Sequence, residues 1–126
     1  MHHVPIAIGS DGGDTQGKHT SQGFIHTSAS YMASQYSEQA LTLKPARHLF
    51  FEIYSNASSD SITLLVIAST KDAAMFVRDN QDLFVAKTKE VVMMGGATVE
   101  DDTLVPDTAH NNEFDSAASA FLYRRC

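Results

Sequence analysis

Cysteine is nearly absent from the 126-residue sequence, where Cys126 is the single example. One cysteine excludes an internal disulfide framework and is typical of a reducing compartment, so we expect a cytoplasmic protein. Basic residues are also few, with 9 Lys and Arg against 15 Asp and Glu and a formal net charge of −6. This acidic balance argues against nucleic acid, and against an anionic membrane surface, as the main partner.

Long apolar runs are missing as well. No stretch reaches the roughly 18–20 apolar residues that a membrane-spanning helix needs. The first residues, MHHVP, have neither the basic flank nor the long apolar core of a secretory signal. The apolar share is nevertheless 43%, which is ordinary for a globular protein and too high for a disordered chain. The length favours a single domain.

Three apolar runs, at residues 4–8, 62–67 and 90–94, predict buried strands. Residues 62–67 (ITLLVI) are apolar almost throughout, which predicts a strand covered on both faces. Helical patterns lie between these runs and after the last one. Strands that alternate with helices are parallel and joined by right-handed crossovers. We therefore expect an α/β protein with a Rossmann-like, mostly parallel sheet and flanking helices.

The helices are predicted from apolar residues spaced three or four apart and from capping residues. They begin near Pro45, near Ser69 or Thr70, after Asn80 and after Asp115, which is a plausible N-cap. The first presents one apolar face, made of Leu49, Phe50, Ile53, Tyr54 and Ala57. The last presents another, made of Ala117, Ala118, Phe121 and Leu122. Residues 9–30, with five glycines, and the acidic residues 98–113 are predicted as loops.

Residues 12–19 (GGDTQGKH) nearly match the phosphate-binding pattern G-x-x-x-x-G-K-[ST] after a predicted strand. His19 stands where that loop needs a hydroxyl for magnesium, and residues 20–23 are a poor helix start. A glycine-rich loop without phosphate is therefore the preferred interpretation. The six histidines have no pair at H-x-x-x-H or similar spacing, so a zinc site is not expected.

Two polar clusters are predicted to meet at the carboxyl ends of the strands, where open parallel sheets bind ligands. Gly95 and Gly96 follow the third strand and either admit a ligand close to the backbone or form a tight turn. Residues 107–115 (DTAHNNEFD) precede the last helix. The adjacent amides of Asn111 and Asn112 can bond to sugar hydroxyls. Alternatively, this segment only caps the helix through Asp115.

Four segments, in this order, resemble the inosine-uridine preferring nucleoside hydrolases. Residues 4–9 (VPIAIG) are similar to V-P-V-x-x-G, and residues 62–68 to the strand before G-P-L-T-N-I-A. Residues 89–97 (KEVVMMGGA) are similar to K-x-V-V-x-M-G-G-x, and residues 110–115 to part of A-E-F-N-x-x-x-D. The resemblance implies a partial nucleoside hydrolase fold, with residues 1–126 as one partial domain from the middle of a longer family domain.

The resemblance implies hydrolysis of the N-glycosidic bond of ribonucleosides in the complete family member. In that family calcium binds the ribose diol and a nucleophilic water, and an aspartate takes the water's proton. By resemblance, the backbone carbonyl of Ile67 would ligate calcium, and Met94 and Asn111 would contact the substrate. His26 would belong to a loop near the substrate, and Asp115 matches a structural position. The family tends to form dimers or tetramers, so a homo-oligomer is a further expectation.

The sequence also departs from the family pattern. The D-x-D-x-x-x-D-D cluster, which supplies most calcium ligands and the base, is absent, and so is a C-terminal His-Asp pair. Ala109 replaces the glutamate of A-E-F-N, and residues 68–72 (ASTKD) replace G-P-L-T-N. We therefore expect neither appreciable hydrolysis nor calcium binding by this chain alone.

Two functions remain open at this point. The first is a nucleoside hydrolase domain that is seen here as one piece of a longer protein. The second is a pseudoenzyme, a non-catalytic binding or interaction module derived from the same fold. In either case bare apolar strand edges predict marginal solubility of the isolated chain.

Overall fold

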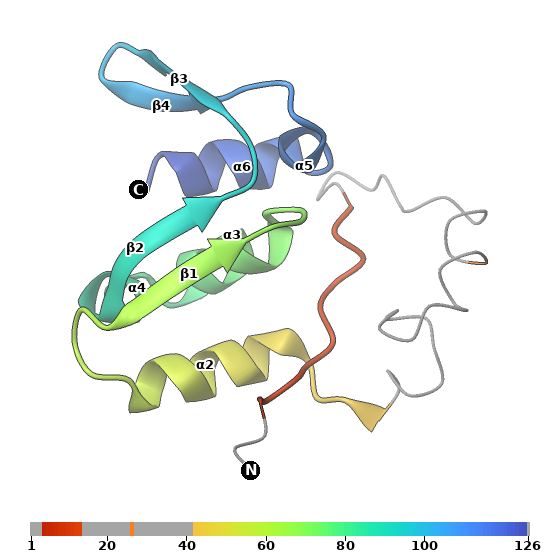
Figure 1. Ribbon diagram of the computed structural model, residues 1–126, viewed down its shortest axis with the longest axis vertical. Coiled ribbons are helices and arrows are strands. Elements are labelled where there is room, and N and C mark those ends of the chain that lie inside the picture. Colours follow the sequence, from red (N-terminus) through yellow and green to blue (C-terminus); the bar gives the residue numbers. More distant parts are fainter. Residues whose placement is uncertain (1–3, 14–25, 27–41, 126) are drawn as a thin grey trace.

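The computed structural model describes residues 4–13, 26 and 42–125. Parallel strands β1 and β2 are joined by two helices, as predicted, and an antiparallel hairpin and two more helices follow (Figure 1). The described elements are α2 (Ala46–Asn56), β1 (Ile62–Val66), α3 (Lys71–Asp79), α4 (Gln81–Lys87), β2 (Thr88–Met93), β3 (Ala97–Glu100), β4 (Thr103–Pro106), α5 (His110–Glu113) and α6 (Ser116–Tyr123). None of these helices is long and apolar enough to cross a bilayer.

The pairing of β1 with β2 brings the carboxyl ends of the two strands together. Leu64 lies opposite Val91 and Val66 opposite Met93. The pairing extends one residue further, because the Met94 N–H donates to the Val66 carbonyl at 2.8 Å. Both arrowheads point toward the side of the molecule that carries α5 and residues 4–13 (Figure 1). We call this end of the two strands the carboxyl edge.

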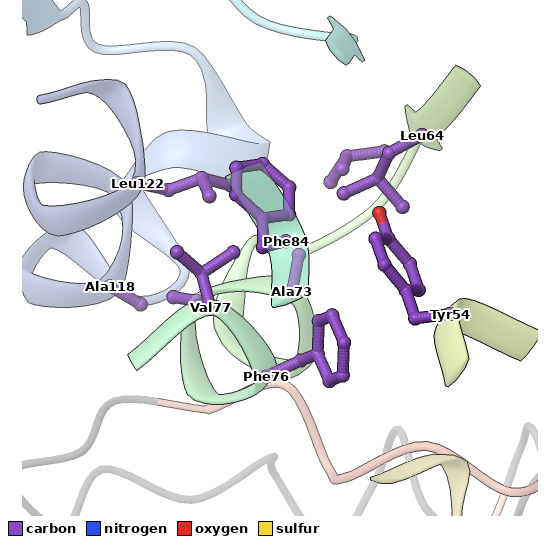
Figure 2. Close-up of a cluster of buried hydrophobic side chains, with 10 residues drawn as sticks. Tyr54, Leu64, Ala73, Phe76, Val77, Phe84, Ala118 and Leu122 are labelled. Atoms are coloured by element: carbon purple, nitrogen blue, oxygen red, sulfur yellow. The ribbon is translucent and has the colours of Figure 1, made fainter. Parts of the chain in front are cut away.

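The hydrophobic core lies against one face of β1 and β2 (Figure 2). Helices α2, α3, α4 and α6 all contribute to it. Its centre is aromatic, because the Tyr54 ring lies 4.6 Å from the Phe76 ring and 6.2 Å from the Phe84 ring. Burying one large apolar side chain contributes about 1.5–3 kcal/mol to folding. The buried members of the cluster are Tyr54, Leu64, Val66, Ala73, Ala74, Phe76, Val77, Phe84, Ala118 and Leu122.

The opposite face of the two strands is exposed, so the prediction of cover on both faces of residues 62–67 is wrong for the described chain. Leu64 and Val66 are buried, whereas Leu65 between them is 59% exposed. In β2, Val92 is 45% exposed. Side chains alternate between the faces of a strand, and the core-forming helices meet only one face. We call the exposed side the outer face.

The apolar residues 4–8 do not form a strand, in contrast to the prediction. Within the described part of the chain, their one sheet-like contact is a bridge between Ile8 and Pro45, in which the Ile8 N–H donates to the Lys44 carbonyl at 3.0 Å. Val4 and Ile6 are exposed. Pro5 has no N–H to donate to a neighbouring strand, and apolar character alone does not supply the paired neighbour that a strand needs.

The predicted acidic loop at residues 98–113 is instead a hairpin followed by the short helix α5. Strands β3 and β4 pair with Glu100 opposite Thr103, so the connection contains only Asp101 and Asp102. Both residues have positive φ, 48° and 58°. A two-residue hairpin turn of this kind needs positive φ at both positions, and aspartate tolerates that conformation better than most residues.

Helix α6 begins as predicted, because the Asp115 carboxylate accepts the Ala118 N–H at 2.9 Å. Its buried face differs in part, since Ala117 is exposed and Ser119 is buried. Thr70 is the N-cap residue of α3, but its hydroxyl bonds to the Ser119 hydroxyl at 2.8 Å and does not cap the helix. Thr70 thus forms a polar contact between α3 and α6, while the hydroxyl of Ser69, the other predicted cap, accepts the Lys71 N–H at 3.3 Å.

Candidate functional site

Three of the four predicted site residues lie at the carboxyl edge. Ile67 directly follows β1 and Met94 directly follows β2, and their side chains are 60% and 61% exposed. Asn111, in α5, donates from Nδ2 to the Met94 carbonyl at 3.0 Å. The structure thus brings together residues that are 44 positions apart in the chain, from Ile67 to Asn111. The edge is formed by the ends of two strands and one short helix.

The hydrogen bond from Asn111 determines what its side chain can offer a ligand. Its Nδ2 group donates to the protein, and no hydrogen bond to its Oδ1 is found within the described ranges. The carboxamide oxygen is therefore available as an acceptor. An oriented carbonyl oxygen of this kind can accept a hydrogen bond from a sugar hydroxyl.

The structure does not place His26, the fourth predicted residue, relative to the carboxyl edge. Its side chain is exposed, and the residues before and after it lie outside the described part of the chain. The same holds for residues 14–19 of the near match to a phosphate-binding loop. A role of His26 near a ligand therefore stays a prediction.

Residues 94–96, which we call the glycine turn, are approached closely by the chain's own side chains. A Cβ atom on Gly95 would lie 2.9 Å from Asn112 Oδ1 and 3.1 Å from the Tyr123 hydroxyl. On Gly96 it would lie 2.2 Å from Asp107 Oδ2, so the exposed Asp107 side chain would have to move. The two glycines therefore leave room for the buried Asn112 side chain and for Asp107 in its present position.

Asp107 is the centre of a hydrogen-bond network beside the glycine turn. Its Oδ1 accepts the Ala109 N–H at 2.9 Å, the Asn112 Nδ2 group at 2.9 Å and the Gly96 N–H at 3.3 Å. The Ala109 bond contributes most to lowering the pKa of this carboxyl, partial desolvation opposes it, and the Asn112 and Gly96 bonds add to the lowering. Sequence reasoning missed this role, although an aspartate two residues before an available N–H is the signature of an Asx turn.

A buried polar chain connects this network to the core. The Asn112 side chain is 2% exposed, and its backbone carbonyl accepts the Ser119 hydroxyl at 3.0 Å. Ser119 in turn contacts Thr70 at the start of α3. Near Gly95, the buried Tyr123 hydroxyl has no hydrogen-bond partner among the residues that the structure describes. Buried polar groups in such a chain fix the position of α5 because each must keep its partner.

Residues 9–13 are fastened to the start of α3 on the other side of the carboxyl edge. The Asp72 carboxylate accepts the Ser10 N–H at 2.9 Å and the Ser10 hydroxyl at 3.0 Å. Lys71 forms an ion pair with Asp11 at 3.1 Å. Next to this contact, a groove of about 210 Å³ runs along β1 and is lined by Ile67 and Asp72 among others.

The donors of the described chain do not fit a calcium ion by themselves. Calcium takes about six to eight oxygen ligands. Asp72, which lines the same groove as Ile67, binds Ser10, and Asp11 binds Lys71. Within residues 4–13, 26 and 42–125, no three His, Cys, Asp or Glu side chains are grouped so that they could hold a metal ion. No chemical step through calcium is therefore assigned to this chain.

Comparison with solved structures finds proteins of similar fold. The chain is similar to the type III effector protein XopQ, solved in complex with adenosine diphosphate ribose, with a TM-score of 0.60 and 29% identity. The match covers 65% of this chain and 25% of XopQ, so the chain spans about a quarter of that protein's length. No protein-family model matches the sequence, and no curated protein matches it. The similarity shows a nucleoside hydrolase-like fold.

Proposed function

We propose that this chain is a nucleoside hydrolase-like domain that binds the ribose of a ribonucleoside at its carboxyl edge. The observation that carries the proposal is the hydrogen bond from Asn111 to the Met94 carbonyl. This bond uses the Nδ2 group and leaves the carboxamide oxygen without a hydrogen bond from the described chain, at the point where β1 and β2 end. Ligands of open parallel sheets bind at this point.

The comparison supports a ribose-containing ligand. XopQ was solved with adenosine diphosphate ribose, which contains ribose hydroxyls. In our proposal, Asn111 accepts a hydrogen bond from one ribose hydroxyl, and the exposed Met94 side chain packs against the apolar side of the ligand. Methionine suits such a contact because its flexible thioether adapts to irregular surfaces.

We further propose that the chain binds without cleaving the N-glycosidic bond. Cleavage in the family uses carboxylates that this sequence lacks, and the described carboxylates near Ile67 are held by Ser10 and Lys71. General acid and base catalysis alone contributes about 100- to 10,000-fold to a rate. We also propose that the chain belongs to the inosine-uridine preferring family. In this proposal, calcium binding and hydrolysis would require a longer form of the protein.

Calorimetric titration of the 126-residue chain with inosine tests the binding proposal. The Asn111→Leu variant should bind inosine about tenfold more weakly or worse, because it removes an acceptor from a hydroxyl that is left unpaired. Asn56→Leu is a matched control, since the Asn56 amide also donates to a backbone carbonyl, that of Glu52, at a remote exposed site. Equal affinity of Asn111→Leu and wild type, or no inosine binding by wild type, would refute the proposal.

The non-catalytic part has its own test. Inosine is incubated with the chain, with and without calcium, and free hypoxanthine is measured by chromatography. We expect no release above the rate in buffer. Calcium-dependent release by wild type that is lost in Asn111→Leu would show instead that this chain is an active hydrolase.

A further inference from the structure

The geometry points to Asp107 and Asn112 as positioning residues that hold Asn111 in its ligand-binding orientation. We call these two residues the latch. The inference rests on the proposed function, because Asn111 is there the residue that meets the ribose. It goes further by assigning the orientation of Asn111 to two residues that touch no ligand.

Asn111 and Asn112 donate hydrogen bonds to the first and last residues of the glycine turn. Asn111 donates to the Met94 carbonyl, and Asn112 donates to the Gly96 carbonyl, each at 3.0 Å. The two bonds run from adjacent residues of α5 to residues two apart in the turn. Any shift of Asn112 relative to Gly96 therefore changes the distance between Asn111 and Met94.

Asp107 holds the glycine turn and α5 together through hydrogen bonds. Its Oδ1 joins the Gly96 N–H, the Ala109 N–H and the Asn112 side chain at one point. A charged acceptor that holds three donors is stronger than a neutral one. The carboxylate lies close to the turn, because a Cβ on Gly96 would be 2.2 Å from Asp107 Oδ2. The Asp107 carboxylate therefore couples the turn to α5.

A purely structural role of Asp107 would be to start α5. Ala109 is the N-cap of α5 and has no side chain that can cap, so Asp107 does accept its N–H. That role needs one of the three bonds. The other two lead to Gly96 and Asn112, and these are the bonds that determine where the Asn111 amide points. A readout at the Asn111 side chain separates the two roles.

The test compares Asp107→Asn with Asp101→Asn in nitrogen-15 labelled full chain. Asp107→Asn keeps the shape and can keep an oxygen at the position of Oδ1, but it replaces a charged acceptor of three hydrogen bonds by a neutral, weaker one. Asp101 lies in the hairpin turn with positive φ, which asparagine tolerates, so this control removes an equal charge without touching the latch. The measurements are hydrogen exchange of the Asn111 side-chain amide and of the Gly96 N–H without ligand, and inosine affinity.

We expect Asp107→Asn to raise both exchange rates by about tenfold and to weaken inosine binding by a similar factor, with Asp101→Asn unchanged. Unchanged exchange of the Asn111 amide in Asp107→Asn would overturn the latch, whatever happens to inosine. If wild type does not bind inosine, the proposed function fails, while the exchange data still decide on the latch. Asp107→Ser keeps an acceptor for the Ala109 N–H alone, so it serves if Asp107→Asn does not fold, and faster exchange is again expected.

Discussion

The two faces of the β1–β2 sheet are made of similar residues and have opposite surroundings. Leu64 and Val66 are buried beneath the helices, while Leu65 and Val92 are exposed on the outer face. Amino-acid type therefore does not decide which face carries the stability. What decides is where α2, α3, α4 and α6 pack, and the described helices pack on one side only. The outer face is apolar surface without cover from the described chain.

The largest effect is expected from shortening a core side chain opposite the inner face. Leu122 of α6 is fully buried, and Leu122→Ala should lower the free energy of unfolding by about 2–5 kcal/mol, because it leaves a cavity. Leu65→Ala deletes the same atoms from the outer face and should cost less than about 1 kcal/mol. Urea denaturation followed by circular dichroism measures both values. Similar losses in the two variants would mean that the outer face is also packed.

A smaller loss is expected when the buried cap of α6 is removed. Asp115 is fully buried and accepts the Ala118 N–H, so Asp115→Ala should cost about 1–2 kcal/mol. Asp82, exposed in the first turn of α4, is the comparison. Its replacement by alanine removes only an interaction with the helix dipole and should cost less. Equal urea midpoints for the two variants would contradict the role of Asp115.

Polar substitution on the outer face should change association more than stability. The pair Leu65→Thr and Val92→Thr keeps good strand propensity, and stability should stay within about 1 kcal/mol of wild type. The share of monomer in size-exclusion chromatography at high concentration should rise, because an exposed apolar patch promotes association. A wild-type chain that is already monomeric at the same concentration would show that the outer face is not adhesive.

The smallest effect is expected from acid. The Ala109 N–H, followed by Asn112 and Gly96, lowers the pKa of Asp107 below its ordinary value of 3.8. A carboxyl with a lowered folded-state pKa stabilises the fold above its ordinary pKa, and this contribution is lost as the pH falls through the folded-state value. Carbon-13 titration of the Asp107 carboxyl should therefore show a midpoint below 3.8. A midpoint at or above 3.8 would contradict the network around Asp107.

The sequence predicted the local elements better than their surroundings. The pattern of β1, the helices from α2 to α4 and the Asp115 cap follow from apolar spacing and capping chemistry, which are local. The helices decide whether one or both faces of residues 62–67 are covered. The helices are distant in sequence, so the residues of the strand do not reveal which case applies. Residues 4–8 read as a strand for the same reason, since apolar character is visible in a sequence while a pairing partner is not.

The arrangement of the candidate site was predictable in part, while the ligand contacts of its residues stay a prediction. Met94 and Asn111 were assigned by resemblance, and the structure places them in contact. The latch was missed because Asp107 and Asn112 sit in a segment that reads as a polar loop, and their partners are the backbone groups of Gly96 and Ala109. The sequence did contain a signal of the β3–β4 hairpin. Two adjacent aspartates at residues 101–102 lie between two short segments with good strand propensity, residues 97–100 and 103–106.

The most direct test of the account is to map inosine on the labelled chain by nitrogen-15 NMR. We predict that the backbone signals of Met94, Gly95 and Gly96 and the side-chain amide of Asn111 shift together along one binding curve, while Leu65 and Val92 on the outer face keep their positions. Shifts confined to the outer face would contradict ribose binding at the carboxyl edge.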